Sequence, residues 1–328
     1  MDSELTLIRD GHLFYRGQDA LELADHASLE EVAGLLWTGE FQAVPIPLKA
    51  QLSLLPLVAE SGLLEQFGHA LVVSGARDLQ AKDARSEALP KNAARILALL
   101  FAVVERSMKL PAAPDLALHQ RLGRAWADGH HGETELLRRA LILIADHELN
   151  VSSFTARCVA SSGASLHHSV LAGLCALQGL NHGLAVEQAA NLLEVTEQRG
   201  APRAIADMLH QTGRLPGFGH LLYPNGDPRA RSLFDELAKT FPQAPAVQAA
   251  LTLSCEVERE LGDRPNIDLA LATVSHLLGQ PNEGGVALFA LGRTVGWLAH
   301  GIEAIRQGHM IRPRARYVGP IPVGTPSV

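Results

Sequence analysis

The chain has 328 residues, a net charge of −7 at pH 7, 47% hydrophobic residues and 19% charged residues. This composition is too apolar and too weakly charged for a disordered chain, and the length provides for one large domain or two. Leu and Ala dominate whereas only 5% of the residues are aromatic, which favours an all-α fold over an all-β one. The acidic balance argues against nucleic acid or an anionic membrane as a partner, since both need a basic face.

The cysteines and the first residues of the chain indicate the cellular compartment of the protein. Cys158, Cys175 and Cys255 lie far apart among small or apolar residues, so we expect buried thiols in a reducing environment. The longest apolar run, residues 96–104, is about half as long as a membrane-spanning helix requires. Residues 1–10 carry acids where a signal peptide carries bases. We therefore expect a cytoplasmic protein without a membrane partner.

The chain opens with a hairpin pattern and then becomes helical. Residues 5–15 alternate apolar and polar side chains around Asp10-Gly11, which predicts a short N-terminal β-hairpin. Ser28 followed three residues later by Glu31 has the spacing of a capping box, and helical periodicity follows it. A helix is therefore predicted to begin there.

Helical periodicity dominates the rest of the chain, and one further start signal is Asp227-Pro228, an aspartate N-cap before a proline at the first helical position. The tail from residue 319 onward carries three prolines and no helical pattern, as in an unstructured segment or an arm on a partner. The predicted helices cover residues 48–60, 62–75, 91–108, 114–127, 133–146, 151–161, 164–178, 185–198, 202–212, 228–240, 245–261, 267–278 and 284–306.

Four short polar segments interrupt the apolar helical sequence near predicted helix ends. For any single loop histidine a solvated or capping role is commoner than catalysis, but three histidines and an aspartate together provide acid, base and hydrogen-bond donor near neutral pH. No metal-ligand spacing or phosphate loop occurs, and the third segment lacks the strand and final glycine of a dinucleotide motif. The segments are residues 146–148, 181–183, 217–220 and 265–268.

Taken in order with both ends of the chain, these segments resemble the citrate synthase family over nearly the full length. Each match is weak by itself, but the ordered set is specific. The matching stretches are Tyr15-Arg16-Gly17, residues 30–33, Asp146-His147-Glu148-Leu149-Asn150, His182-Gly183, Pro216-Gly217-Phe218-Gly219-His220, Asp227-Pro228-Arg229, Pro265-Asn266-Ile267-Asp268, residues 288–293, residues 296–300 and Ile311-Arg312-Pro313-Arg314.

The resemblance implies an almost entirely α-helical homodimer of two-domain subunits. Residues 1–182 and 284–328 would form a large domain, residues 183–283 a smaller mobile domain, and the active site would lie between them. The family condenses the methyl carbon of an acyl-CoA, usually acetyl-CoA, with the keto group of a 2-oxo acid, usually oxaloacetate, and then hydrolyses the thioester. The coenzyme A thioester would be a co-substrate, and no metal or permanently bound cofactor is expected.

Three of the matching residues would be catalytic by this resemblance. The methyl group of a thioester is a very weak acid, so a carboxylate can remove its proton only if the enolate oxygen is stabilised at the same time. Asp268 would be the base, and His182 would donate a hydrogen bond to the thioester carbonyl as a neutral imidazole. His220 would polarise the keto group.

Four further residues would bind the keto acid. A dicarboxylate suits guanidinium groups, which form bidentate hydrogen bonds with carboxylates. Arg229, Arg293 and Arg312 occupy the substrate-arginine positions of the family, and Arg312 would reach across from the other subunit. His147 would add another contact.

The coenzyme would contact the loop of Gly217, Phe218 and Gly219. The neighbouring aromatic residues Trp297 and Phe289 are expected in the core. Gly183 is expected to permit a positive φ and a close backbone approach.

The sequence departs from the family pattern beside the coenzyme. Residues 221–226 lack the basic residues that commonly help to hold its phosphates, so binding would be weaker or would use another arginine: Arg203, Arg214 or Arg231. Close alternatives are a 2-methylcitrate synthase that uses propionyl-CoA and a citryl-thioester lyase. An alternative of another class is a non-catalytic sensor or partner subunit that binds di- or tricarboxylates.

Overall fold

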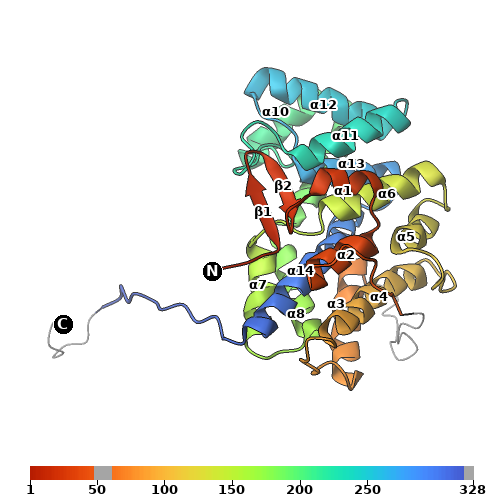
Figure 1. Cartoon of the computed structure of the whole chain (residues 1–328). Coiled ribbons are helices and arrows are strands. Elements are labelled where there is room, and N and C mark those ends of the chain that lie inside the picture. Colours follow the sequence, from red (N-terminus) through yellow and green to blue (C-terminus); the bar gives the residue numbers. More distant parts are fainter. Residues whose placement is uncertain (48–60, 321–328) are drawn as a thin grey trace.

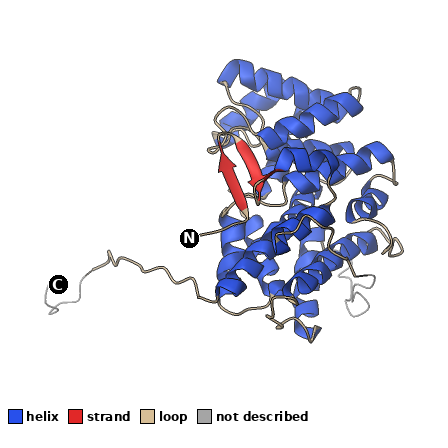
Figure 2. Ribbon diagram, in the orientation of Figure 1, coloured by secondary structure: helices blue, strands red, loops and turns tan. Residues whose placement is uncertain are grey.

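The computed structural model describes residues 1–47 and 61–320, which form an all-α fold with one small sheet (Figures 1 and 2). Helices make up most of the described chain, so the predicted fold class is confirmed. The elements are β1 (Thr6–Arg9), β2 (His12–Tyr15), β3 (Gln18–Asp19), α1 (Ala20–His26), α2 (Leu29–Thr38), α3 (Leu63–Arg77), α4 (Leu89–Ser107), α5 (Leu118–Trp126), α6 (His131–Leu143), α7 (Val151–Ser161), α8 (Leu166–Leu177), α9 (Leu184–Arg199), α10 (Ala201–Thr212), α11 (Pro228–Thr240), α12 (Pro245–Leu261), α13 (Ile267–Leu277) and α14 (Gly284–Gln307).

The N-terminal hairpin is confirmed. β1 and β2 pair antiparallel, with Thr6 opposite Tyr15. Asp10 and Gly11 turn the chain with φ values of 54° and 79°, a left-handed backbone that these residue types adopt readily. The prediction missed β3, which pairs with β2, and the short helix α1. A strand of two residues is too short to leave an alternating pattern.

The structure confirms the two predicted helix starts, at Ser28 and at Asp227. The Ser28 hydroxyl accepts the Glu31 N–H at 3.2 Å, and the Glu31 carboxylate accepts the Ser28 N–H at 2.8 Å, which completes the capping box. Asp227 caps α11. From α3 to α14 every helix begins and ends within four residues of its predicted bounds. The predicted helix at 48–60 and the tail residues 321–328 lie outside the described residues.

Helix α14 runs through the centre of the fold, and most of its residues are buried (Figure 1). It packs against α2, α4, α6, α7 and α8, and also against α9 and α13. Trp37 of α2 donates its indole N–H to the Val295 carbonyl at 2.9 Å. Trp297 and Phe289 are buried as predicted. Within residues 1–47 and 61–320, α14 alone is long and apolar enough to cross a membrane, and its apolar stretch is wholly buried in the fold.

Helices α9 to α13 form a group at one end of the molecule (Figure 1). α9 packs against α10, α12 and α13, and α11 packs against α12 and α13. α13 also contacts α6 and α14, so it borders the rest of the fold. This group falls within the predicted small domain, residues 183–283. The division into two domains and the mobility of the smaller one stay predictions.

Two local expectations are wrong. Cys175 and Cys255 are exposed and Cys158 is half-buried, because the apolar residues around them belong to the opposite, buried side of the same helices. Gly183 has a φ of −59°, so it needs no left-handed backbone. The close approach at Gly183 is nevertheless present, since a Cβ there would lie 2.5 Å from the Leu177 carbonyl oxygen.

Candidate active site

The loop after α6 is held tightly against α14. Arg293 donates through Nε to the Ile144 carbonyl at 2.7 Å, and the Gly296 N–H donates to the Ala145 carbonyl at 2.9 Å. A Cβ at Gly296 would lie 2.4 Å from that same carbonyl oxygen. Only glycine therefore lets α14 come this close, and the contact fixes the backbone that leads to the buried His147.

Tyr223 lies against two of the predicted histidines, His147 and His220. The Tyr223 hydroxyl lies 2.9 Å from His147 Nε2, and the ring of His220 lies edge-on to that of His147 at 5.3 Å. The Leu222 N–H donates to His220 Nδ1 at 3.2 Å, so a neutral His220 carries its proton on Nε2. Burial and the charge of Arg229 lower the pKa of both histidines, that of His147 strongly. Both rings are neutral at pH 7.

The polar segment of residues 217–220 pairs with the start of α13. The Gly219 N–H donates to the Arg264 carbonyl at 2.9 Å. The Asn266 N–H donates to the Gly217 carbonyl at 2.9 Å, and the Asn266 side chain donates to the Gly219 carbonyl at 3.0 Å. Asn266 also caps α13 by accepting the Asp268 N–H at 2.9 Å. Segments almost 50 residues apart in sequence are thus joined.

Gly217 is required where this loop meets α13. Its φ is 85°, and a Cβ there would lie 2.8 Å from the Cβ of Leu269. Phe218 is half-buried and forms an antiparallel bridge with Pro265. The loop of Gly217, Phe218 and Gly219 is therefore rigid, while its contact with a coenzyme stays a prediction.

Asp227 ties α11 to α13 and holds the first arginine. Arg229 donates through Nε and Nη2 to the two oxygens of Asp227 at 3.0 and 2.8 Å. The Ile267 N–H donates to the same carboxylate at 3.1 Å. The guanidinium of Arg229 is buried and lies over the Tyr223 ring, 5.5 Å from its centre. A bidentate pair of this kind fixes the orientation of the arginine.

Arg293 differs from Arg229 because part of its guanidinium has no partner. Its central carbon lies 4.7 Å from the centre of the Phe289 ring. Nη1 is buried and makes no hydrogen bond to any described residue. Burial lowers the pKa of Arg293 to about 10, against the opposing effect of the Asp146 carboxylate. The side chain stays charged at pH 7, and a buried cation with an open donor is suited to bind an anion.

His182 stands at the start of α9 and faces α7. Its Nε2 lies 2.8 Å from the Ser152 hydroxyl oxygen, which also accepts the Trp297 indole N–H at 3.1 Å. Its ring is edge-on to that of Phe289 at 5.7 Å. Burial and the charge of Arg293 lower the pKa of His182 to about 4. The imidazole is therefore neutral at pH 7, as its predicted role requires.

Asp268 is a partly buried carboxyl group near both arginines. Burial raises its pKa to about 7, although the charges of Arg229 and Arg293 act in the opposite direction. Asp227 adds a smaller repulsion that raises it further. A carboxylate that titrates close to pH 7 is a stronger base than an ordinary aspartate and is suited to proton abstraction.

The comparisons with known proteins fit this geometry. Residues 1–314 match the family model described as citrate synthase, C-terminal domain. The chain belongs to the citrate synthase family. It is 30% identical to citrate synthase 2 of Bacillus subtilis, over 97% of this chain and 93% of the relative. It is also 26% identical to 2-methylcitrate synthase 2 of Corynebacterium glutamicum, over 94% and 88%.

A solved citrate synthase has the same fold. It comes from Thermoplasma acidophilum and was determined as a ternary complex with carboxymethyl coenzyme A and oxaloacetate. The two structures superpose with a TM-score of 0.82 and 27% sequence identity, over 100% of this chain and 96% of that one.

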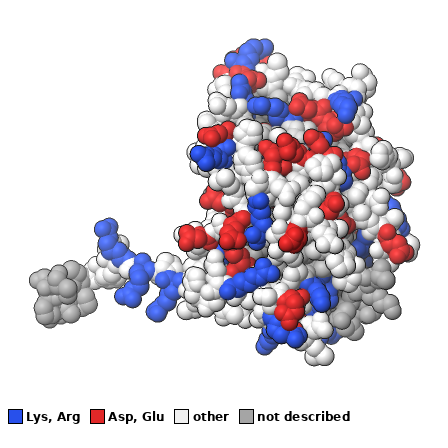
Figure 3. Space-filling model, viewed as in Figure 1, with Lys and Arg blue, Asp and Glu red and all other residues white. Residues whose placement is uncertain are grey.

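Six of the seven residues predicted from the citrate synthase resemblance to act on the keto acid or the thioester gather in this one place. The exception is Arg312, which is exposed on the extended segment after α14 that leaves the body of the molecule (Figures 1 and 3). Its predicted role therefore needs a second subunit. The six residues that gather are His147, His182, His220, Arg229, Asp268 and Arg293.

No group of three or more His, Cys, Asp and Glu side chains in residues 1–47 and 61–320 could hold a metal ion.

The sequence analysis missed three side chains of the site. Tyr223 contacts His147, Ser152 contacts His182, and Phe289 contacts both His182 and Arg293. Phe289 was predicted as a core residue, and it is buried, but one face of it lines the site. The only local signal for Tyr223 was its position, three residues after the predicted site residue His220.

The segment without basic residues after His220 begins with two exposed leucines, before the buried Tyr223. Leu221 is fully exposed and Leu222 about half exposed. Of the three alternative arginines, Arg203 forms an ion pair with a nearby aspartate on α10. Arg231 contacts a backbone carbonyl, and the guanidinium of Arg214 contacts two neutral amide side chains, one of them that of Asn181 beside His182.

Proposed function

We propose that this protein is a citrate-synthase-like acyltransferase that condenses acetyl-CoA, or a related acyl-CoA, with oxaloacetate and hydrolyses the thioester to citrate and coenzyme A. One observation carries the proposal: Asp268, whose pKa burial raises to about 7, lies near the buried Arg229 and Arg293, and the charge of Arg293 also acts on the neutral His147 and His182. This set supplies a base, hydrogen-bond donors and an anion site together. The family relationship supports the same reaction.

The keto acid would lie between the arginines. Arg293 offers its unpaired Nη1 to one carboxylate, and Arg229 is held rigidly by Asp227 for the other. His147 adds a contact from the opposite loop. Arg312 of a second subunit would complete the site, so we propose a homodimer.

The thioester would lie between Asp268 and His182. Asp268 takes a proton from the methyl carbon, and the electron pair moves to the thioester oxygen as an enolate. With the Ser152 proton directed to Nε2 of His182, the ring carries its own proton on Nδ1 and can donate it to that oxygen. The raised pKa of Asp268 makes the transfer less uphill.

The new carbon–carbon bond forms when the enolate carbon attacks the keto carbon. His220 donates a hydrogen bond from Nε2 to the keto oxygen, where negative charge develops, and Leu222 fixes this tautomer. The resulting alkoxide takes up a proton to become the product hydroxyl, which balances the proton taken by Asp268. Water then cleaves the thioester and releases the free thiol of coenzyme A. The rigid loop of Gly217, Phe218 and Gly219 lies beside this path and would contact the coenzyme.

The acyl donor is the open choice within this function, since curated relatives include both citrate and 2-methylcitrate synthases. The test is a free-thiol release assay with oxaloacetate and either acetyl-CoA or propionyl-CoA. Release that requires both substrates supports the proposal, and the larger kcat/KM identifies the donor. Citryl-CoA in the same assay tests the lyase direction.

We also propose that the protein works in the cytoplasm.

No release in a protein that oxaloacetate stabilises against heat would overturn the synthase proposal. A ligand stabilises only a protein that binds it. That outcome, together with no stabilisation by coenzyme A, would favour a carboxylate sensor, to which the exposed Leu221 and the absent basic residues near it would then be relevant.

A further inference from the structure

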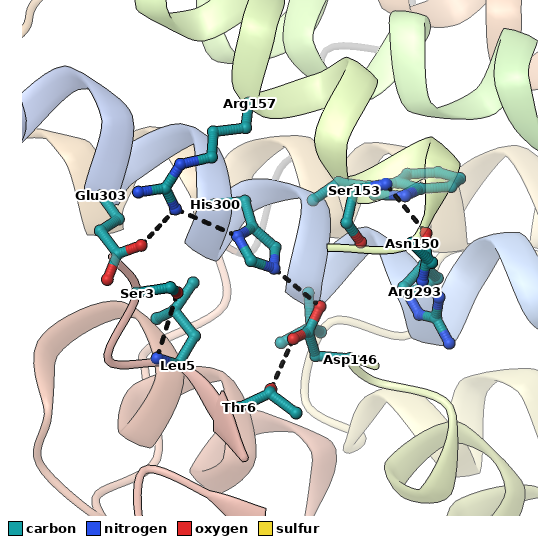
Figure 4. Close-up of polar contacts among 12 residues, drawn as sticks. Ser3, Leu5, Thr6, Asp146, Asn150, Ser153, Arg157, Arg293, His300 and Glu303 are labelled. Atoms are coloured by element: carbon teal, nitrogen blue, oxygen red, sulfur yellow. Dashed lines mark hydrogen bonds and ion pairs between the residues drawn. The ribbon is translucent and has the colours of Figure 1, made fainter. Parts of the chain in front are cut away.

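A buried chain of polar groups connects the active-site loop to the far end of α14 (Figure 4). It begins at Asp146, which is fully buried and immediately precedes His147. One carboxylate oxygen of Asp146 accepts the Thr6 hydroxyl at 2.5 Å. The other lies 3.3 Å from His300 Nε2. Thr6 lies in β1 and His300 in α14, so three separate segments meet at this carboxylate.

The chain continues from the other side of the His300 ring. His300 Nδ1 lies 3.3 Å from Nη1 of Arg157, which is fully buried and forms an ion pair with Glu303. An arginine can only donate, so Nδ1 accepts and Nε2, which lies 3.3 Å from the Asp146 carboxylate, carries the ring proton. His300 therefore lies between a cation and an anion, with Arg157 on one side and Asp146 on the other.

Asp146 acts on two groups that the proposed reaction uses. Its backbone leads directly into His147. Its carboxylate is the nearby charge that most favours the protonated form of Arg293. The same loop accepts the Nε hydrogen bond of Arg293 through the Ile144 carbonyl. A displacement of Asp146 would therefore move His147. It would also weaken the stabilisation of the charged form of Arg293.

We propose that His300 is a positioning residue that acts through Asp146 to hold His147 and Arg293 in place for the keto acid. The proposal rests on the proposed function, since it assigns a role within the same site. His300 is fully buried and is not among the residues proposed to contact either substrate. Asp268 and His182 are held by other contacts, at Asn266 and Ser152. The effect of losing His300 should thus fall on the keto acid more than on the thioester.

The test compares two substitutions of His300. His300→Leu removes both ring nitrogens, whereas His300→Gln keeps a donor for Asp146 and an acceptor for Arg157. We expect His300→Leu to raise the KM for oxaloacetate about tenfold, the loss of roughly one hydrogen bond to a charged group, with the KM for the acyl-CoA changed less than about threefold. His300→Gln should stay within about threefold of the parent for both.

His167→Leu is the matched control. His167 is equally buried, lies in α8 and contacts Ser74 rather than the active-site loop. It should lower the melting temperature without changing either KM. If His300→Leu does not fold, Thr6→Val removes the other donor to Asp146 from a half-buried strand and should shift the oxaloacetate KM about threefold in the same direction.

The outcomes separate this inference from the proposed function. A parent protein without condensing activity refutes the proposed function. An active parent in which the variants at His300 and Thr6 leave the oxaloacetate KM unchanged, or raise both KM values equally, refutes the positioning role. Failure of His300→Gln to restore the parent value would also refute it, because the amide can make both contacts.

Discussion

Replacing Asp268 by asparagine should have opposite effects on activity and stability. Asparagine cannot accept the methyl proton, and loss of a general base typically slows a reaction about 10²- to 10⁴-fold. Keto-acid binding should persist, because Arg229 and Arg293 remain. The burial that makes Asp268 a stronger base also makes its ionised form costly in the folded protein, and asparagine removes that cost.

The sign and size follow from the pKa of Asp268. It rises from 3.8 to about 7 on folding, so the folded protein holds this proton more tightly than the unfolded chain does. Stability contributed by the protonated group is thus lost as the pH rises from about 4 to about 7. Three pKa units correspond to about 4 kcal/mol, and partial exposure of Asp268 reduces this to roughly 2–3 kcal/mol.

Urea denaturation of the parent and of Asp268→Asn between pH 4 and 8 measures this directly. The free energies of unfolding should be nearly equal at pH 4 and differ by about 2–3 kcal/mol in favour of the variant above pH 7. In the parent, kcat/KM should rise with pH through one ionisation near 7. A variant with full turnover, or a stability difference that does not vary with pH, would refute this account of Asp268.

Three further substitutions test the site geometry. Arg293→Gln removes the unpaired buried donor and should weaken oxaloacetate binding about 10- to 100-fold by calorimetry; an unchanged affinity would place the keto acid elsewhere. Tyr223→Phe removes the hydroxyl that contacts His147 and should lower kcat/KM about three- to tenfold without unfolding, so parental kinetics would argue against a role. Gly217→Ala forces a Cβ against Leu269 at a positive φ and should cost about 2–3 kcal/mol in urea denaturation, whereas a loss under about 1 kcal/mol would mean that the loop adapts.

The helices were predictable because their boundaries are encoded locally. The capping box at Ser28 and the caps at Asp227 and Asn266 use side chains within three residues of the N–H groups they bind. Local periodicity likewise indicated the helix ranges between these caps. The same reasoning failed for Cys175, since apolar neighbours do not show which side of the helix a residue occupies.

The site could be assembled from the sequence only through the family resemblance. Tyr223 reaches His147 across 76 residues of sequence, and Ser152 reaches His182 across 30. Neither contact leaves a local pattern, because both depend on how α9, α11 and α13 pack against the remaining helices. The pKa of Asp268 depends on burial in that same packing.

The balance of charge within one chain also bears on the assembly. Arg229 is already neutralised by its bidentate pair with Asp227. Of the two buried site arginines, Arg293 is the one that touches no carboxylate directly, so its charge is free to meet a substrate. A dicarboxylic 2-oxo acid brings two negative charges, and the three nearby histidines are neutral at pH 7. One chain thus leaves one carboxylate under-compensated, which is the physical reason to propose that Arg312 of a second subunit completes each site.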